Sequence, residues 1–352
     1  MVMHVCTTGA MACVENGETS SAVSVPVVEA TKIVAVRLLE HVPVLGDSVP
    51  ESVQGRLHKN ASFWTNDLES SSFVRDIILH GYRMPFTVLP WPIFKYNHHS
   101  ALKQSDFVSS AIEELLATGC VVSSNECPAV CSPLSVVENA KGKLRLVLDL
   151  RYVNQFLPQQ KFKYEGLDLV VQMFKKGEYF FTFDLKSGYH HVDIHVDFWK
   201  YLGFSWKTKG SRCFYMFRVL PFGLASACYV FTKLLRPLVK KWRSSGIKAI
   251  MYIDDGIVAA ESRQKCTAHQ EIVVGDLKRV GFVLNASKSC LVPQLVGKWL
   301  GFIVNLYEGN FYIPEDKLES LKSAIKSAYP LAKVPVRLLA SVVARECTLQ
   351  PC

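Results

Sequence analysis

The chain has 352 residues, 49% of them hydrophobic and 20% charged, a composition that argues against an intrinsically disordered protein. The net charge is +9, and residues 57–352 carry +12, because 37 basic residues outnumber 25 acidic ones there. Such an excess favours a polyanionic partner, most often nucleic acid. No apolar run reaches about 18 residues, so we expect no membrane-spanning helix and no membrane partner.

Eleven cysteines are scattered along the chain without a CxxC pair. The closest group, Cys120, Cys127 and Cys131, does not have the spacing of a zinc site. Isolated cysteines with apolar neighbours are typical of reduced core residues, and the N-terminus has no signal-peptide pattern. We therefore expect an intracellular protein, cytoplasmic or nuclear, whose oligomeric state the sequence leaves open.

The N-terminal third changes composition twice. Residues 1–55 are rich in Val, Ser, Thr, Ala and Glu without a sustained period, which predicts a poorly ordered leader. Residues 56–100 bring aromatic residues and prolines, which predict an extended lead-in with one short helix over 72–79. Apolar residues at helical spacing then predict a helix over 105–118 that ends at Gly119.

The middle of the chain alternates between predicted strands and helices. The expected strands are 120–122, 132–137, 144–151 and 179–185, and a helix is expected over 166–177. The turn at 139–143 contains Lys141 and Lys143, and its basic tip suits either a phosphate contact or a solvated turn. The strand over 179–185 is strongly apolar and carries one carboxylate, Asp184.

Residues 190–196 alternate in polarity, which predicts a further strand. His191, Asp193 and His195 would share one face of it, as a possible metal site. A solvent-facing polar face is the favoured interpretation, because nothing supplies a fourth ligand.

The C-terminal half begins with a loop containing Pro221 and Gly223 that leads into a helix reaching Trp242. The pattern then predicts a helix over 264–280, a strand over 299–304, a hairpin near 307–310 and a helix over 315–328.

Between the helix that reaches Trp242 and the helix over 264–280 lies a stretch, 249–258, in which two adjacent carboxylates are flanked by apolar residues. The pattern predicts a hairpin with Asp254 and Asp255 at its tip, followed by Gly256. Like charges so close are costly unless a cation neutralises them, and carboxylate oxygens suit Mg²⁺ or Mn²⁺. Taken alone, the motif is more often an ordinary solvated turn than a metal site.

The order of these motifs resembles the palm of a reverse transcriptase over about residues 100–305. The motifs are the strand ending in Asp184, the Pro-Phe-Gly helix start, the Tyr252-Ile253-Asp254-Asp255 hairpin, Lys288 and Trp299-Leu300-Gly301. The resemblance implies an α+β right-hand polymerase fold, with fingers, a palm whose antiparallel sheet is backed by helices, and a partial thumb. The domains expected from it are a leader (1–55), a lead-in to the fingers (56–100), fingers and palm (101–305, palm core about 166–190 and 217–305) and the start of a truncated thumb (306–352).

The resemblance also implies a role for each matching residue. The catalytic residues would be Asp184, Asp254, Asp255 and Lys288, with Lys288 protonating the leaving pyrophosphate. The metal ligands would be the carboxylates of Asp184, Asp254 and Asp255 and the backbone carbonyl of Leu185. The dNTP site would comprise Arg145, Lys143, Tyr189 as steric gate, Phe222 and Gly223. The primer grip would be Trp299, Leu300 and Gly301.

The function implied is that of an RNA-directed DNA polymerase, part of a retroelement polyprotein, which adds dNTPs to a primer 3′-hydroxyl on an RNA or DNA template. Two Mg²⁺ ions are the implied cofactors, and Mn²⁺ is an alternative. Residues 144–154, 184–191 and 221–227 look like retrotransposons rather than retroviruses. Residues 73–82 and 230–238 are similar to DIRS-type elements, which integrate with a tyrosine recombinase.

The sequence departs from the family pattern in two places. Cys228 stands where the family commonly has proline, and the resemblance fades after Ala344, within the expected thumb. One alternative is therefore a truncated or co-opted fragment that binds nucleic acid without synthesis. Another is an RNA-dependent RNA polymerase, against which Tyr189 and the Tyr252-Ile253 form of the hairpin argue.

Overall fold

The computed structural model describes residues 52–139, 142–208 and 210–329. Nearly all of the predicted leader and residues 330–352 of the predicted thumb lie outside the described residues. In the described part, no helix is both long and apolar enough to cross a membrane.

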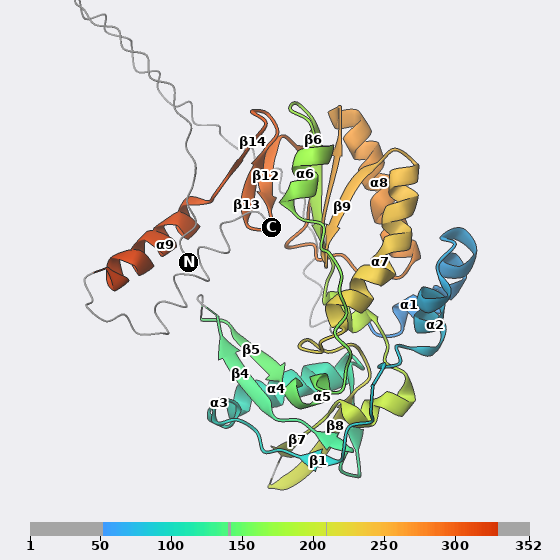
Figure 1. Cartoon of the computed structure of the whole chain (residues 1–352), viewed down its shortest axis with the longest axis vertical. Helices are drawn as coiled ribbons and strands as arrows, with labels where there is room; N and C mark the ends of the chain where they lie inside the picture. The colour runs from blue at the N-terminus through green and yellow to red at the C-terminus, as the bar shows by residue number, and fades with distance from the viewer. Residues whose placement is uncertain (1–51, 140–141, 209, 330–352) are drawn as a thin grey trace, which may run out of the picture. The chain divides into compact units, whose positions relative to one another are not determined.

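A four-stranded antiparallel sheet is present where the palm was expected (Figure 1). Its strands are β6 (Tyr179–Asp184), β9 (Lys248–Tyr252), β10 (Asp255–Ala260) and β11 (Cys290–Gln294), in the order β11-β6-β10-β9. The helices α7 (Ala227–Ser244) and α8 (Arg263–Arg279) pack against it. These elements confirm the strand, hairpin and two long helices predicted for this region.

The central strand β6 is mostly apolar and almost entirely buried, because both of its faces are covered. Phe181 and Phe183 belong to the large core that contains α7 and α8, whereas Phe180 belongs to a second cluster on the opposite face. That second cluster includes α6 (Leu167–Met173), which ends earlier than the predicted 177 because Phe174 has already adopted an extended backbone. The two clusters pack on opposite faces of the sheet, and this packing fixes the position of Asp184 at the end of β6.

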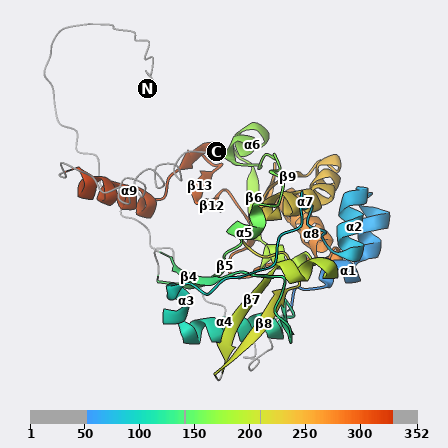
Figure 2. The same ribbon diagram turned by 60° about the horizontal axis from the view of Figure 1, so that its bottom comes forward.

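The region expected to form the fingers combines two sheets. The five-stranded sheet contains β1 (Ile93–Phe94), β3 (Val130–Cys131), β7 (Gly203–Thr208), β8 (Ser211–Phe217) and β2 (Val121–Ser124), in that order. The two-stranded sheet is the hairpin of β4 (Leu134–Glu138) and β5 (Leu144–Leu148). The helices α3 (His99–Lys103) and α4 (Ser105–Ala117) accompany them, as Figure 2 shows from a second direction.

The lead-in is more helical than predicted. Besides α2 (Ser72–His80), it forms α1 (Arg56–Lys59) and a π-helical turn, Phe63–Asp67. Trp64 in that turn is fully buried, and its indole N–H donates to the backbone carbonyl of Val280 at 3.1 Å. Prolines and aromatic residues suggested an extended chain, but this distant anchor at the end of α8 stabilises short helices instead.

The prediction of a strand over 190–196 is wrong. The chain forms 3₁₀ turns at Gly188–His191 and Val196–Tyr201, and only isolated bridges, Ile194 with Tyr82 and Asp193 with Val219, lie between them. His191 is buried rather than solvent-facing. Alternating polarity here reflects packing against several different segments, not one continuous strand partner.

The strand predicted over 144–151 ends early, at Leu148, and Arg151–Asn154 forms the short helix α5. The reason is local, because the carboxylate of Asp149 accepts the backbone N–H of Arg151 at 3.1 Å and so turns the chain out of the strand.

The strand predicted over 299–304 is a hairpin. Its strands are β12 (Val296–Trp299) and β13 (Phe302–Asn305), and Leu300 and Gly301 form the turn with φ of 46° and 77°. Positive φ at both central residues is the geometry of the tightest hairpin turns. The next hairpin leads to β14 (Asn310–Tyr312), and α9 (Glu315–Ala328) follows, both as predicted.

Candidate active site

The register of the palm sheet brings the three predicted carboxylates together. Asp184, the last residue of β6, pairs directly with Asp255, the first residue of β10. The backbone N–H of Leu185 donates to the carbonyl of Asp254 at 2.9 Å. Two chain segments 69 to 71 residues apart are thus fixed at one edge of the sheet by backbone hydrogen bonds.

The hairpin tip is a two-residue turn of Ile253 and Asp254. Ile253 has a φ of 55°, which is rare for a β-branched residue and costs about 1–3 kcal/mol. Behind the tip, a Cβ at Gly256 would clash with the Phe183 ring. Glycine at 256 therefore lets the Phe183 ring pack directly against the hairpin backbone next to the carboxylates.

Asp184 is held in an almost closed environment, with 6% of the residue exposed. Its backbone N–H donates to Ser289 Oγ at 3.0 Å, and its Oδ2 accepts from Lys288 Nζ at 3.2 Å. Its other oxygen, Oδ1, is buried and has no hydrogen-bond partner in the described part of the chain. An anionic oxygen left in this state is costly, and a bound cation would satisfy it.

The electrostatics also favour a cation. Burial, followed by the negative charges of Asp254 and Asp184, raises the pKa of Asp255 to about 6. Burial raises the pKa of Asp254 as well, and the charge of Asp184 adds to the shift. The three carboxylates thus fit oxygen ligands for a hard divalent ion. The three carboxylates are neighbours in the sheet, but their side chains do not point to one common position. Among the described residues, no three His, Cys, Asp or Glu side chains form a ready-made metal cluster.

Lys288 reaches Asp184 from a loop that hydrogen bonds tie to the carboxylate segment. Lys186 donates its N–H to the carbonyl of Val283, and Asn285 donates to the carbonyl of Asp184, both at 2.8 Å. Leu185 lies between these bonds and faces Leu284. Its backbone is therefore fixed beside Asp184, next to the position expected for a backbone ligand.

Two residues that sequence analysis did not single out for this site, Ser289 and His191, hold the same junction. His191 Nε2 accepts the backbone N–H of Val283 at 3.1 Å, and its Nδ1 lies 3.2 Å from the carbonyl of Gly188. The ring therefore bridges the two segments in its neutral form, and burial lowers its pKa to about 3. No short-range pattern marks either residue, because each contacts a partner about 90 to 105 positions away.

Tyr189 lies behind the carboxylates with 7% of its surface exposed. Its ring contacts Phe222 and Phe231, with centroid distances of 5.0 and 5.4 Å. Its hydroxyl lies 2.9 Å from Cys228 Sγ, the residue that stands in place of the expected proline. Burial and this thiol raise the pKa of Tyr189, so the phenol is neutral and the ring is firmly placed.

Phe222 and Gly223 form the loop before α7. Phe222 is 56% exposed, and Gly223 has a φ of 90°. The side-chain amide of Asn154 holds this loop, because it donates to the carbonyl of Gly223 at 2.9 Å and accepts from the N–H of Ala225 at 2.8 Å. Asn154 is a further positioning residue that the sequence did not single out.

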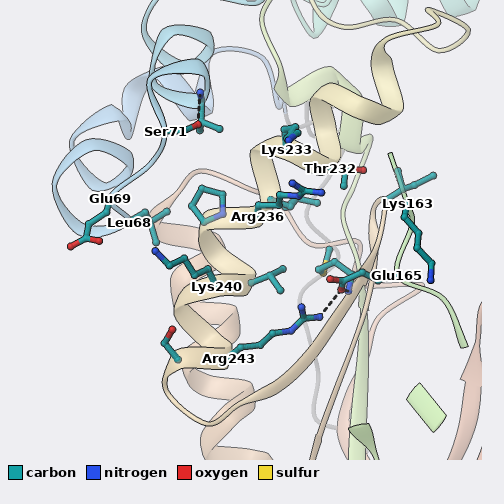
Figure 3. A pocket seen from close by; sticks show the side chains of 17 residues that line it. Leu68, Glu69, Ser71, Lys163, Glu165, Thr232, Lys233, Arg236, Lys240 and Arg243 are labelled. Carbon is teal, nitrogen blue, oxygen red and sulfur yellow. Dashed lines mark hydrogen bonds and ion pairs between the residues drawn. The ribbon is translucent and has the colours of Figure 1, made fainter. Parts of the chain in front are cut away.

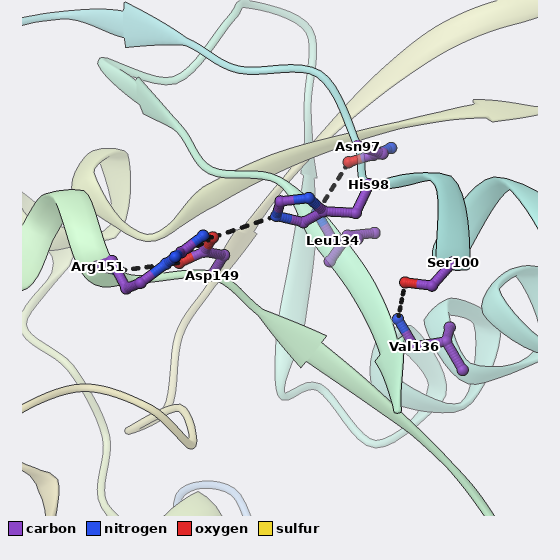
Figure 4. A network of polar contacts seen from close by, with 7 residues as sticks. All are labelled: Asn97, His98, Ser100, Leu134, Val136, Asp149 and Arg151. Carbon is purple, nitrogen blue, oxygen red and sulfur yellow. Dashed lines mark hydrogen bonds and ion pairs between the residues drawn. The ribbon is translucent and has the colours of Figure 1, made fainter. Parts of the chain in front are cut away.

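A polar network fixes the base of the fingers hairpin (Figure 4). The carboxylate of Asp149 accepts from Arg151 at 2.6 Å and contacts His98 Nε2 at 3.2 Å, and the pKa of Asp149 falls well below its usual range, chiefly because of Arg151. His98, Asp149, Arg151, Asn154 and Gly223 line a hollow of about 510 Å³. The hollow joins the fingers to the loop before α7.

The remaining predicted residues belong to other elements. Arg145 lies on β5 opposite Val137, and Arg145 and Lys143 are both exposed, whereas Lys141 lies outside the described residues. Trp299 is buried in the cluster that contains Phe180, and Leu300 and Gly301 form the turn beside it. Among the described residues, none of these side chains forms a hydrogen bond or ion pair with the three carboxylates.

Comparison with known proteins identifies relatives over this region. Residues 137–304 match the family model described as "Reverse transcriptase (RNA-dependent DNA polymerase)". The chain is 27% identical over 221 residues to the Pol polyprotein from transposon gypsy of Drosophila melanogaster, covering 61% of the chain and 20% of that protein. It is 27% identical over 238 residues to the Pro-Pol polyprotein of feline foamy virus, covering 67% of the chain and 19% of that protein. The chain thus spans about a fifth of the length of these relatives.

Solved structures share the fold. A foamy viral protease-reverse transcriptase in complex with dsDNA superposes with a TM-score of 0.60 at 19% identity, covering 83% of this chain and 62% of that one. The same kind of protein in complex with an RNA/DNA hybrid also gives 0.60, at 18% identity, covering 82% and 39%. The right-hand polymerase fold expected from the sequence is confirmed.

Proposed function

We propose that this chain adds dNTPs to the 3′-hydroxyl of a primer paired with an RNA or DNA template. The match of residues 137–304 to the reverse transcriptase model and the similarity to retrotransposon and retroviral Pol polyproteins support this proposal. One observation carries the proposal. Asp184 and Asp255 are direct cross-strand partners at the end of a buried sheet, and a buried oxygen of Asp184 has no partner among the described residues.

The cofactor we propose is Mg²⁺, held by Asp184, Asp254, Asp255 and the carbonyl of Leu185, with Mn²⁺ as a substitute. When bound, such ions neutralise the charge that develops on the attacking and leaving oxygens. Asp184 and Asp255 contribute by standing in fixed register before substrate arrives, so little reorganisation is needed. The partnerless oxygen of Asp184 and the raised pKa values of Asp254 and Asp255 support this assignment.

The surrounding residues would act on the nucleotide. The ammonium of Lys288 lies 3.2 Å from Asp184 and would donate a proton to the pyrophosphate as it leaves. The ring of Tyr189 presents a rigid wall to a sugar 2′-hydroxyl, which favours dNTPs over rNTPs. Arg145 would bring its planar guanidinium to the triphosphate from the fingers hairpin.

The test is extension of a DNA primer on an RNA template by the full chain, with Mg²⁺, with Mn²⁺ and with EDTA. We expect template-dependent DNA products with either metal ion and none with EDTA. Absence of extension by a folded chain that still binds the primer–template would overturn the proposal and favour a binding module without synthesis. Incorporation of rNTPs in preference to dNTPs would instead indicate an RNA-making polymerase.

We further propose that the chain derives from a DIRS-type element. The segments 73–82 and 230–238 support this assignment. Sequencing of the genomic region downstream of the gene checks it: a tyrosine recombinase reading frame is expected, and a retroviral-type integrase there would contradict it.

A further inference from the structure

A groove with a volume of about 930 Å³ runs along α7 (Figure 3). It is lined by α7, from Thr232 to Ser244, with Leu68, Glu69 and Ser71 of the lead-in on one side of the helix and Lys163 and Glu165 of the segment before α6 on the other. Met251 and Ile253 also line it. Because Ile253 precedes Asp254 in the hairpin turn, the groove begins beside the candidate active site.

Basic side chains dominate the lining. The groove contains Lys163, Lys233, Arg236, Lys240 and Arg243, against the two acidic residues Glu69 and Glu165. Two of these cations have acidic partners. Arg243 donates to Glu165 at 2.7 Å, and Lys163 lies 3.4 Å from Asp168.

The other three cations form a separate set on α7. Within the described ranges, Lys233, Arg236 and Lys240 have no ion-pair partner. Arg236 and Lys240 are exposed, whereas Lys233 is half-buried with its ammonium 5.4 Å from the centre of the Tyr229 ring. Positions i, i+3 and i+7 lie on one face of a helix, over about 10 Å of its axis. A nucleic-acid strand rises about 3.4 Å per phosphate, so about three phosphates can face these three cations.

Hydrogen bonds and a ring contact join both α7 and the segment before α6 to the hairpin at 249–258. Arg243 also donates to the backbone carbonyl of Ala249 at 2.8 Å, and Glu165 accepts the N–H of Met251 at 3.1 Å. The Tyr164 ring contacts the Tyr252 ring, with centroids 5.0 Å apart. The groove wall and the catalytic hairpin are therefore one connected structure, and an occupant of the groove reaches the hairpin.

We propose that this groove binds the sugar-phosphate backbone of a nucleic-acid strand that continues from the candidate active site along α7. The inference rests on the proposed polymerase function and adds to it a second binding track outside the carboxylate centre. Arg236 and Lys240 contact phosphates, and the apolar floor, which includes Leu235, Val239 and Met251, contacts the sugars.

The experiment compares Arg236→Gln/Lys240→Gln with wild type by fluorescence anisotropy of a labelled RNA–DNA primer–template over a range of salt concentrations. Loss of two phosphate contacts should lower the slope of log K against log salt by about 1.4–1.8, which corresponds to about 25- to 60-fold weaker binding at 0.1 M salt. The matched control is Arg263→Gln/Lys278→Gln, which removes the same charges from exposed positions on α8. The control should keep the wild-type slope.

Two substrates show which part of the nucleic acid lies in the groove. A larger loss for a template with a long 5′ overhang than for a blunt duplex assigns the groove to the single strand, whereas equal loss assigns it to the duplex. Either result supports the proposal. A wild-type affinity and slope in the double variant would overturn it, as would an effect as large in the control.

The same measurements separate this inference from the proposed function, because binding is measured without dNTPs. Wild type that binds the primer–template but does not extend it refutes the polymerase activity and leaves the groove test intact. Wild type that does not bind refutes the groove. Thermal unfolding of each variant verifies folding, and the single variants Arg236→Gln and Lys240→Gln should each give about half of the slope change.

Discussion

The carboxylate centre and the fingers hairpin are both antiparallel pairs, yet they hold their polar side chains in opposite ways. The β6–β10 pair is covered on both faces, and Asp184 at its end is 6% exposed. The β4–β5 pair is a separate two-stranded sheet in which Arg145 is exposed and Val137 is 52% exposed. A two-stranded sheet has little stability of its own. The palm therefore holds its carboxylates by packing and strand pairing, and we expect the exposed side chains of the fingers hairpin to be less firmly held.

Changes in the palm should therefore affect the chemical step and the stability of the fold. Changes in the fingers hairpin should affect nucleotide affinity alone. Substitutions in each region test this division.

The strongest test is Asp184→Asn, which removes the charge but keeps the shape of the side chain. We expect primer extension to fall about 10³-fold or more, while binding of the primer–template changes little. Single-turnover extension and anisotropy measure the two quantities. Asp106→Asn, at an exposed position on α4, is the control and should retain activity. Extension near the wild-type rate by Asp184→Asn would refute the metal-ligand assignment.

Tyr189 tests whether a buried palm side chain also sets specificity. Replacing it with alanine removes the ring that Phe222 and Phe231 hold in place, so discrimination against rNTPs should fall about 10- to 100-fold. The ratio of kcat/KM for dNTP and rNTP measures it. Tyr189→Phe keeps the ring, loses the contact with Cys228 and should retain most of the discrimination. Equal ratios in Tyr189→Ala and wild type would exclude the steric-gate role.

Gly256→Ala tests how tightly the Phe183 ring packs against the hairpin. The added Cβ meets the Phe183 ring, so the free energy of unfolding should fall by about 1–3 kcal/mol. Gly275→Ala on α8 is a matched control, since no atom lies within 4 Å of the added methyl, and it should stabilise the helix by up to about 1 kcal/mol. Urea unfolding of both variants gives the comparison. Equal stability of the two would show that the Phe183 ring moves aside at little cost in free energy.

His191 makes the palm junction sensitive to acid. Its pKa is lowered to about 3 when folded and is about 6.5 when unfolded, so its contribution to stability is complete above pH 6.5 and is lost as the pH falls. By pH 5 the loss amounts to about 2 kcal/mol. His191→Gln should remove this part of the pH dependence, while the nearby Arg56 and His190 contribute equally to both proteins.

Thermal unfolding of wild type and His191→Gln between pH 7.5 and 5 provides the measurement. His99→Gln, at an exposed position on α3, serves as the control and should follow wild type. Parallel pH profiles for wild type and His191→Gln would contradict the assignment.

The same contrast explains what the sequence could and could not predict. The β6 strand, the hairpin at 249–258 and the helices α7 and α8 have strong apolar patterns, and they were predicted because local preference and burial agree there. The resemblance supplied the pairing of Asp184 with the hairpin. Ser289, His191 and Asn154 were not singled out for the site, because their roles come from hydrogen bonds to distant backbone groups. The 190–196 segment was mispredicted for the same reason, since its alternation reflects several packing partners.

The smallest effect is expected in the fingers, from Arg145→Gln. Arg145 is exposed and opposite Val137 on a hairpin that pairs with no other strand in the described residues, so its removal should leave the stability within about 0.5 kcal/mol of wild type. If its guanidinium binds the triphosphate, the KM for dNTP should rise about tenfold while kcat changes little. Steady-state extension at varied dNTP concentration measures both constants, and Arg83→Gln, an exposed arginine of the lead-in, is the control. A fall in kcat with an unchanged KM would show that the fingers hairpin takes part in the chemical step, and the division between a firmly held palm and less firmly held fingers would then fail.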